Sequence, residues 1–249
     1  MVFKSLAAVP FGEYFIGLIF FIPLTLTYLA FAFLKPDAKS VMKVAGDRVL
    51  LFLRPFSYDR LPIESRRIWD FGSFSGSIEL EELVSAAMGR AFYTVAIGEP
   101  GESVPTLSSL KSYFSDDEWR NELLRWLDRA DSIVIVPASL NSVWEMQQVV
   151  RLGYQDKLII LIPKPIYKKD PQRAEQIQEA VWEITRAVFQ GTSWQYSVES
   201  LRQHRGMIPL ALSVGQGGSA MAIYSRDFEY YDYSTALVIL NGKVAQSWK

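Results

Sequence analysis

The sequence predicts an α/β protein in which a doubly wound parallel sheet follows one transmembrane helix and precedes a small β-rich extension. Short apolar runs alternate with amphipathic segments, which is typical of a parallel sheet covered by helices on both faces. A charge-free run stands near the amino terminus, and the alternation ends near residue 190. The expected parts are an N-terminal segment (1–13), a transmembrane helix (14–34), a juxtamembrane linker (35–46), an α/β domain (47–190) and the extension (191–249).

The composition excludes several chemistries. The 249 residues include no Cys and one His, so a Cys nucleophile, a disulfide, a zinc–thiolate site and a multi-His metal centre are all excluded. The 26 basic residues nearly balance the 27 acidic ones, and the formal charge is −1. Nucleic acid is therefore not expected as a partner, and no metal or required cofactor is expected either.

The run from Tyr14 to Leu34 contains no charged residue, and as a helix of about 30 Å it would match the hydrocarbon core of a bilayer. The basic residues lie mainly after it, at Lys35, Lys39, Lys43 and Arg48, which predicts a bilayer contact and a cytoplasmic C-terminal domain. The alternative is a signal peptide cleaved near 30–32. The run is longer than the usual apolar region of roughly 7–15 residues, so we expect a single-pass anchor.

The elements of the α/β domain follow from apolar runs and helix-capping signals. Continuous apolar runs, typical of strands buried on both faces, predict strands at 48–53, 93–98, 132–136 and 158–162. Helices are expected from a Ser77 cap to residue 88, from Trp119 after the acidic Ser115–Glu118 segment, over 142–152, and from Asp170-Pro171 to Gly191.

The sequence pattern of the extension differs from that of the α/β domain. Residues 207–214, 220–224 and 235–248 have the pattern of short strands. The dipeptide Asn241-Gly242 is a strong signal for a two-residue hairpin turn. These segments predict a β-rich C-terminal unit.

Ligands of doubly wound sheets bind outside the carboxyl ends of the strands, which directs attention to the loops 54–59, 98–106, 137–145 and 163–168. The loop at 137–145 places Glu145 in the first turn of a helix, beside Trp144 and after the small hydroxyl residue Ser139. Such a carboxylate could orient a ribose hydroxyl or stabilise an oxocarbenium-like centre while an N-glycosidic bond breaks. The alternative is that Ser142-Val143-Trp144-Glu145 is a capping box, in which Glu145 accepts a backbone N–H.

Two other loops supply candidate ligand contacts. Arg54 and Phe56 follow the first strand, where an Arg could hold a phosphate or form an ion pair with an acid such as Asp131 or Glu145. Gly98, Pro100 and Gly101 follow the second strand; the glycines would let the backbone approach a ligand, although a plain turn needs the same residues.

The pattern of these loops resembles TIR-like domains and the related nucleoside deoxyribosyltransferase-like folds. The longer arrangement is similar to membrane-anchored bacterial TIR-like proteins, on four motifs: Leu53-Arg54-Pro55-Phe56, Ile97-Gly98-Glu99-Pro100-Gly101, Trp119 and Trp144-Glu145. The resemblance covers roughly residues 47–165. It implies a flavodoxin/TIR-like sheet, a nucleotide ligand of the NAD type, and Glu145 as the catalytic carboxylate.

Two functions remain open. In the first, the domain is a signalling glycohydrolase or transferase that cleaves NAD or a related nucleotide, with Trp144 touching the ring and Arg54 the phosphate. In the second, the same crevice binds a nucleotide or a partner protein without chemistry, as a membrane-tethered sensor or interaction module. The resemblance also suggests that the chain assembles into a homo-oligomer.

Overall fold

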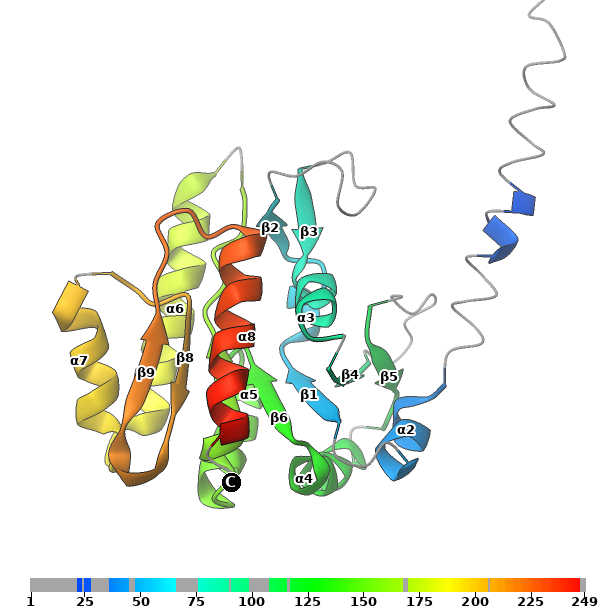
Figure 1. Cartoon of the computed structure of the whole chain (residues 1–249), viewed down its shortest axis with the longest axis horizontal. Coiled ribbons are helices and arrows are strands. Elements are labelled where there is room, and N and C mark those ends of the chain that lie inside the picture. Colours follow the sequence, from blue (N-terminus) through cyan, green and yellow to red (C-terminus); the bar gives the residue numbers. More distant parts are fainter. Residues whose placement is uncertain are drawn as a thin grey trace, which may run out of the picture.

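A computed structural model describes residues 22, 23, 25–27, 36–44, 48–65, 76–89, 91–98, 108–115, 117–167, 170–205 and 207–246. The described residues contain a seven-stranded sheet in the order β5-β4-β1-β6-β7-β8-β9 (Figure 1). The strands are β1 (Val49–Leu53), β4 (Tyr93–Ile97), β5 (Leu110–Ser112), β6 (Ser132–Ile135), β7 (Leu158–Leu161), β8 (Ala211–Val214) and β9 (Ala220–Ile223). The five strands from β5 to β7 are parallel, whereas β8 and β9 are antiparallel to their neighbours.

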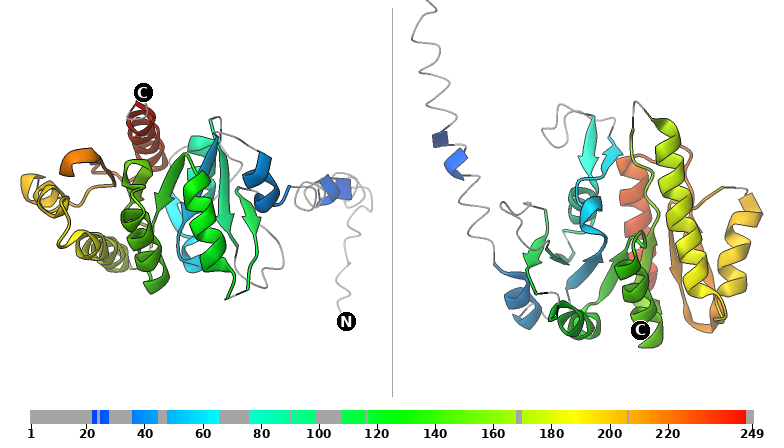
Figure 2. Two further views of the ribbon diagram at one scale, coloured as in Figure 1. Left: turned by 90° about the horizontal axis from the view of Figure 1, so that it is seen from below. Right: turned by 180° about the vertical axis from the view of Figure 1, so that it is seen from behind.

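Helices cover both faces of the sheet. The helices are α2 (Ala38–Val44), α3 (Leu80–Met88), α4 (Trp119–Arg129), α5 (Leu140–Arg151), α6 (Pro171–Phe189), α7 (Gln195–Arg205) and α8 (Tyr230–Gln246). α3 and α8 pack together on one face, and α5 and α6 pack on the other (Figures 1 and 2). Every residue of β1, β6 and β7 is consequently buried, which explains why these strands read as unbroken apolar runs.

The strand order differs from the flavodoxin/TIR-like order. Numbered along the chain, the five parallel strands run 3-2-1-4-5, because the short strand β5 pairs outside β4 at the edge of the sheet. From β1 the chain proceeds to β4 and β5 on one side and then returns to β6 on the other. The switch point of the sheet therefore lies between β1 and β6, where a crevice opens at the carboxyl ends of the strands.

The prediction of a transmembrane helix over 14–34 is wrong. Most of that run lies outside the described residues, which include only 22, 23 and 25–27 of it. In the part of the chain that the structure describes, no helix is both long enough and apolar enough to cross a bilayer. The membrane contact and the single-pass cytoplasmic placement, which depended on that helix, are withdrawn with it.

The segment expected to be a juxtamembrane linker contains helix α2. Ala38 and Met42 are buried against the sheet edge, and the Lys39 backbone N–H donates to Ser112 Oγ at 3.0 Å. The Ser112 hydroxyl in turn donates to Asp37. These contacts fix α2 beside β5.

The β-rich extension is also corrected. β8 and β9 join the main sheet, and α7 and α8 accompany them, so residues 191–249 are not a separate β unit. Residues 235–246 belong to α8, and Asn241-Gly242 lies inside this helix rather than in a hairpin. The buried residues Tyr233, Ala236, Leu237 and Leu240 recur at helical spacing and face the core. Burial of this stripe outweighs the local turn signal.

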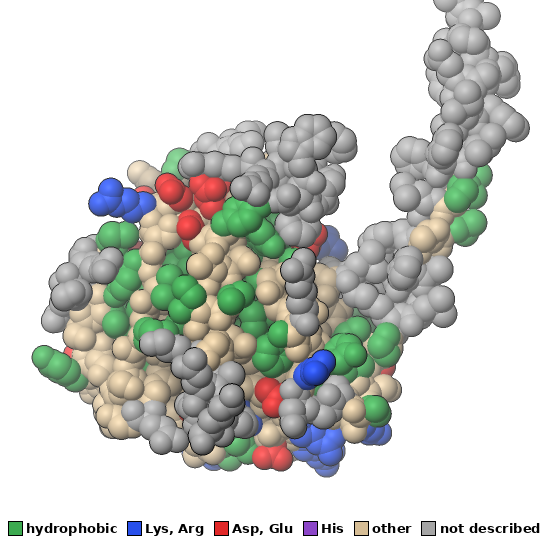
Figure 3. Space-filling view, in the orientation of Figure 1, with side chains coloured by type: hydrophobic (Ala, Val, Ile, Leu, Met, Phe, Trp, Pro, Cys, Tyr) green, Lys and Arg blue, Asp and Glu red, His purple; other side chains and the backbone are tan. Residues whose placement is uncertain are grey.

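The opposite side of α8 leaves hydrophobic side chains at the surface. Val238 and Ile239 are exposed, and Figure 3 shows hydrophobic side chains scattered over the face on which α3 and α8 lie. They alternate with polar atoms, as is usual for a protein surface.

We expect Gly242→Ala to stabilise the protein by about 0.5–1 kcal/mol, because a methyl group at this helical position meets no atom within 4 Å and Ala favours a helix over Gly. Urea unfolding monitored by circular dichroism measures the change. Gly153→Ala is the control and should destabilise, since Gly153 has a φ of +81°. A loss of stability in Gly242→Ala would contradict a helical conformation at this residue and favour the predicted hairpin turn.

Candidate functional site

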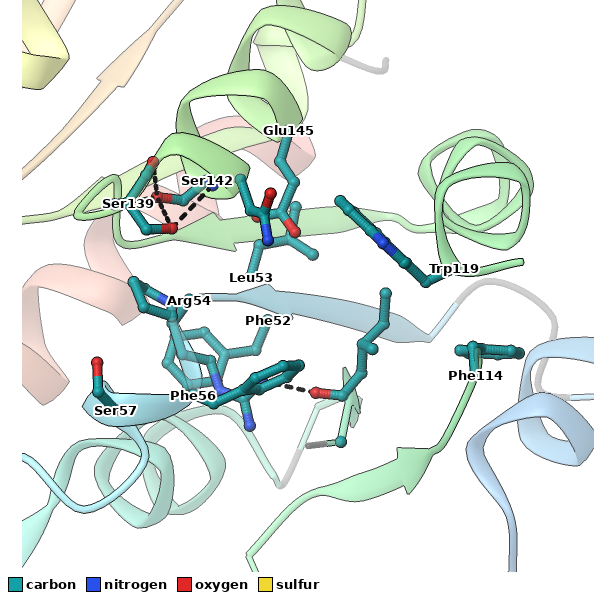
Figure 4. Close-up of a pocket in the computed structure, with 14 residues that line it drawn as sticks. Phe52, Leu53, Arg54, Phe56, Ser57, Phe114, Trp119, Ser139, Ser142 and Glu145 are labelled. Carbon is teal, nitrogen blue, oxygen red and sulfur yellow. Dashed lines mark hydrogen bonds between the residues drawn. The ribbon is translucent and has the colours of Figure 1, made fainter. Parts of the chain in front are cut away.

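A cavity of about 300 Å³ opens at the switch point of the sheet (Figure 4). The end of β1 forms its floor, the end of β4 and the start of α4 form one wall, and the first turns of α5 form the other. Its lining residues are Phe52, Leu53, Arg54, Pro55, Phe56, Ser57, Ile97, Gly98, Phe114, Trp119, Ser139, Asn141, Ser142 and Glu145. The predicted site residues Arg54, Phe56, Gly98, Ser139 and Glu145 thus converge on one space, although they come from three separate loops.

Glu145 projects from α5 into this cavity, toward the aromatic side chains (Figure 4). It is 8% exposed, and its Oε2 atom is buried with no hydrogen-bond partner among the described residues. Burial raises the pKa of Glu145 to about 8, with the Arg54 charge opposing the shift. The residue is therefore mostly a neutral carboxylic acid at pH 7.

The capping role considered for Glu145 is taken by other side chains. Ser139 is the N-cap residue of α5, and its Oγ accepts the Ser142 N–H at 3.2 Å. The Ser142 hydroxyl oxygen accepts the Ser139 N–H at 2.8 Å, which completes a reciprocal capping box. The two serine side chains thus accept hydrogen bonds from the backbone N–H groups at the start of α5, and the Glu145 carboxyl group lies in the cavity instead.

Arg54 lines the cavity, but its guanidinium group is engaged in the interior. Nη1 donates to the Ile97 carbonyl oxygen at 2.9 Å, Nη2 donates to Glu81 Oε2 at 3.0 Å, and Nε lies 2.7 Å from Asp59 Oδ1. The side chain is 1% exposed. Arg54 therefore forms ion pairs, as one interpretation expected, but with Asp59 and Glu81 rather than with Asp131 or Glu145.

Lys111 completes a buried charge network with Arg54, Asp59 and Glu81. Its Nζ lies 3.1 Å from both Asp59 Oδ2 and Glu81 Oε2. Burial lowers the pKa of Lys111, but the Glu81 and Asp59 carboxylates outweigh this effect and hold the pKa above its usual value. For Asp59, burial raises the pKa more than the Arg54 and Lys111 charges lower it. The network joins two cations to two acids in the interior.

Trp119 occupies the wall where Trp144 was expected. Trp119 lines the cavity, whereas Trp144 packs behind it with ring centroids 5.4 Å apart and an interplanar angle of 78°. This edge-to-face contact fixes the orientation of the lining ring. Phe52, Phe56 and Phe114 add three further aromatic side chains to the lining.

Gly98 has a structural reason to be glycine. A Cβ atom at this position would lie 2.3 Å from Cε1 of Tyr113, so the tyrosine ring occupies the space beside it. Gly98 also lines the cavity, where its backbone remains accessible. Pro100 and Gly101, the other predicted ligand contacts on this loop, lie outside the described residues.

The arrangement offers an aromatic cleft, small hydroxyl and amide groups, and one isolated carboxyl group. Among the described residues, no cluster of three or more His, Asp or Glu side chains could hold a metal ion. No family model, curated protein or solved structure matches the chain. The site chemistry rests on Glu145 and the groups around it.

The stability of Glu145→Gln should depend on pH. Between pH 4.5 and about pH 8 the native state keeps a proton that the unfolded state releases, so the stability of the unmodified protein falls as the pH rises through this window. Glutamine does not ionise, and the variant should gain about 2–4 kcal/mol relative to the original protein near pH 8 and little near pH 4. Urea unfolding across this range measures the difference; parallel profiles would contradict the assignment.

Arg54→Ala should destabilise the protein by about 3–5 kcal/mol, because it leaves the buried Glu81 and Asp59 carboxylates with one cation between them. Arg125→Ala is the matched control, since Arg125 pairs with Glu122 at the surface and should contribute less than about 1 kcal/mol. Denaturant unfolding compares them. Equal losses would show that the buried network contributes no more than a surface pair.

Proposed function

We propose that the cavity binds the nucleoside part of an NAD-like nucleotide, and that Glu145 assists cleavage of its N-glycosidic bond. One observation carries the proposal: the Glu145 carboxyl group is buried in the cavity, and in the described part of the chain its Oε2 atom has no hydrogen-bond partner. A buried polar atom that the protein leaves unpaired calls for a ligand group or water. The loop motifs that resemble TIR-like domains point to the same chemistry, although the strand order of the sheet differs from theirs.

The lining suits a nucleoside. Its volume of about 300 Å³ lies at the lower end of the range for small-molecule sites, which admits one nucleoside unit rather than a whole dinucleotide. Phe52, Phe56, Phe114 and Trp119 supply apolar and stacking surfaces for a planar base. The polar side chains of Ser139 and Asn141 lie on the α5 side, where ribose hydroxyls could bond.

The reaction needs a carboxylate more than it needs a strong acid. When the bond between the anomeric carbon and a cationic nicotinamide ring breaks, its electron pair goes to the ring nitrogen and nicotinamide leaves neutral. Positive charge develops on the ribosyl group, where ionised Glu145 would stabilise it. Water then adds to the anomeric carbon and releases a proton to solvent.

The raised pKa of Glu145 does not oppose this role. A cationic ring beside the carboxyl group favours its ionised form, so binding would release the Glu145 proton to solvent. The bound carboxylate would then face the charge that develops on the sugar.

The same pKa supports a second candidate function. A neutral Glu145 is a hydrogen-bond donor near pH 7, so it could bind an acceptor oxygen of an uncharged ligand without any chemistry. The domain would then be a nucleotide sensor or a protein-interaction module. Such binding should weaken above about pH 8, where the donor proton is lost.

Nicotinamide release from NAD by the purified chain tests the catalytic role. We expect release to increase from pH 6 to pH 8 as Glu145 ionises, and to fall about 10²–10³-fold in Glu145→Gln, because the amide carries no negative charge. Glu175→Gln, an exposed substitution on α6, is the control and should leave the rate unchanged.

The two candidate functions give different results. Release that is equal in Glu145→Gln and the original protein would contradict the catalytic role. A ligand that raises the melting temperature but releases no nicotinamide, with affinity falling above pH 8, would favour the binding module.

A further inference from the structure

We infer that Arg120 binds the phosphate attached to the nucleoside, and so makes the site select a nucleotide over a nucleoside. This inference rests on the proposed function and adds the group that recognises the anionic part of the ligand. It assigns to Arg120 the phosphate contact that the sequence had suggested for Arg54.

The cations of the interior are not available to a phosphate. Arg54 and Lys111 each contact both Asp59 and Glu81, and both side chains are 1% exposed. A phosphate could reach either cation only by displacing a buried carboxylate, which would leave that acid unpaired in the interior. The anionic group of a ligand therefore has to find its partner nearer the surface.

Arg120 is a cation that contacts the ring of Trp119, which lines the cavity, although Arg120 is not itself a lining residue. It follows Trp119 at the start of α4, and its Cζ atom lies 5.4 Å from the Trp119 ring centroid and 5.3 Å from the Trp144 ring centroid. Its side chain is exposed, and within the described parts of the chain no carboxylate pairs with it.

The stacking arrangement prepares this guanidinium group for an anion. A guanidinium held over aromatic rings keeps its N–H donors around its edge, and this planar edge matches the oxygens of a phosphate. Trp119 lines the cavity and its ring contacts Arg120, so a ligand packed against Trp119 shares this contact residue with the guanidinium group. The two indoles also limit the conformations of the arginine, which lowers the entropy lost on binding.

The first turn of α5 is the competing location. The Leu140 and Asn141 N–H groups begin this helix, and Asn141 lines the cavity. However, Glu145 lies about one turn further along and also faces the cavity, so its ionised form would repel an anion bound there. Arg120 offers a full positive charge instead.

Two nicotinamide ligands that differ only by a phosphate test the inference: nicotinamide riboside and nicotinamide mononucleotide. Dissociation constants are measured by calorimetry on the full chain carrying Glu145→Gln, which prevents consumption of the ligands. In this background we expect the mononucleotide to bind about tenfold more tightly than the riboside, because its phosphate gains a charge-assisted hydrogen bond. Arg120→Gln should remove this preference without changing riboside affinity, and Arg120→Lys should restore part of it.

Arg125→Gln is the matched control, because Arg125 lies on the same helix but pairs with Glu122. It should leave the preference intact. A preference that survives Arg120→Gln, or that is lost in Asn141→Ala instead, would overturn the inference and place the phosphate at α5. Equal weakening of both ligands in Arg120→Gln would overturn it as well, since Arg120 would then only support Trp119.

The two ligands distinguish a failure of the Arg120 inference from a failure of the proposed nucleoside site. Riboside binding without any phosphate preference would overturn the role of Arg120 alone. Failure of both ligands to bind would contradict the proposed nucleoside site and the inference together.

Discussion

The buried network of Arg54, Asp59, Glu81 and Lys111 determines how the candidate site is built. It ties the end of β1 to the turn after it, to α3 and to the edge strand β5. Ser108 and Ser109 add hydroxyl donors to Glu81 Oε1 at 2.9 and 2.5 Å. Charges removed from water are tolerated only when they are paired and hydrogen-bonded, so the four side chains constrain one another and hold these elements together.

The network also explains the electrostatics of the cavity. Arg54 is close enough to Glu145 to lower its pKa, but the two carboxylates that hold Arg54 offset most of its positive charge. Burial therefore dominates at Glu145, and its carboxyl group remains neutral near pH 7. The ligand therefore determines the protonation state of Glu145. A cationic ring favours loss of its proton, whereas an acceptor oxygen receives a hydrogen bond from the neutral acid.

Much of the sheet and part of the site follow from local sequence patterns. The apolar runs form β1, β6 and β7, which are buried at every residue, and β4, which is buried at every residue except Tyr93. The rule that ligands bind at strand ends then selected the loops that carry Arg54, Gly98 and Glu145, which line one cavity. The charge network was not foreseen, because Glu81 reads as a favourable first-turn acid and Lys111 lies in a three-residue strand with little pattern of its own. Helix α8 was mistaken for strands because a local Asn-Gly signal carries no information about the tertiary packing of Leu237 and Leu240.

The most direct test of this account is the ionisation of Glu145 itself. Carbon-13 NMR of the side-chain carboxyl group, assigned by comparison with Glu145→Gln, follows its titration in the ligand-free protein. We expect a midpoint near pH 8, because burial keeps this carboxyl group neutral. A midpoint near the ordinary value of 4.5 would show that the carboxyl group is solvated or paired, and would contradict the isolated acid on which the proposed chemistry depends.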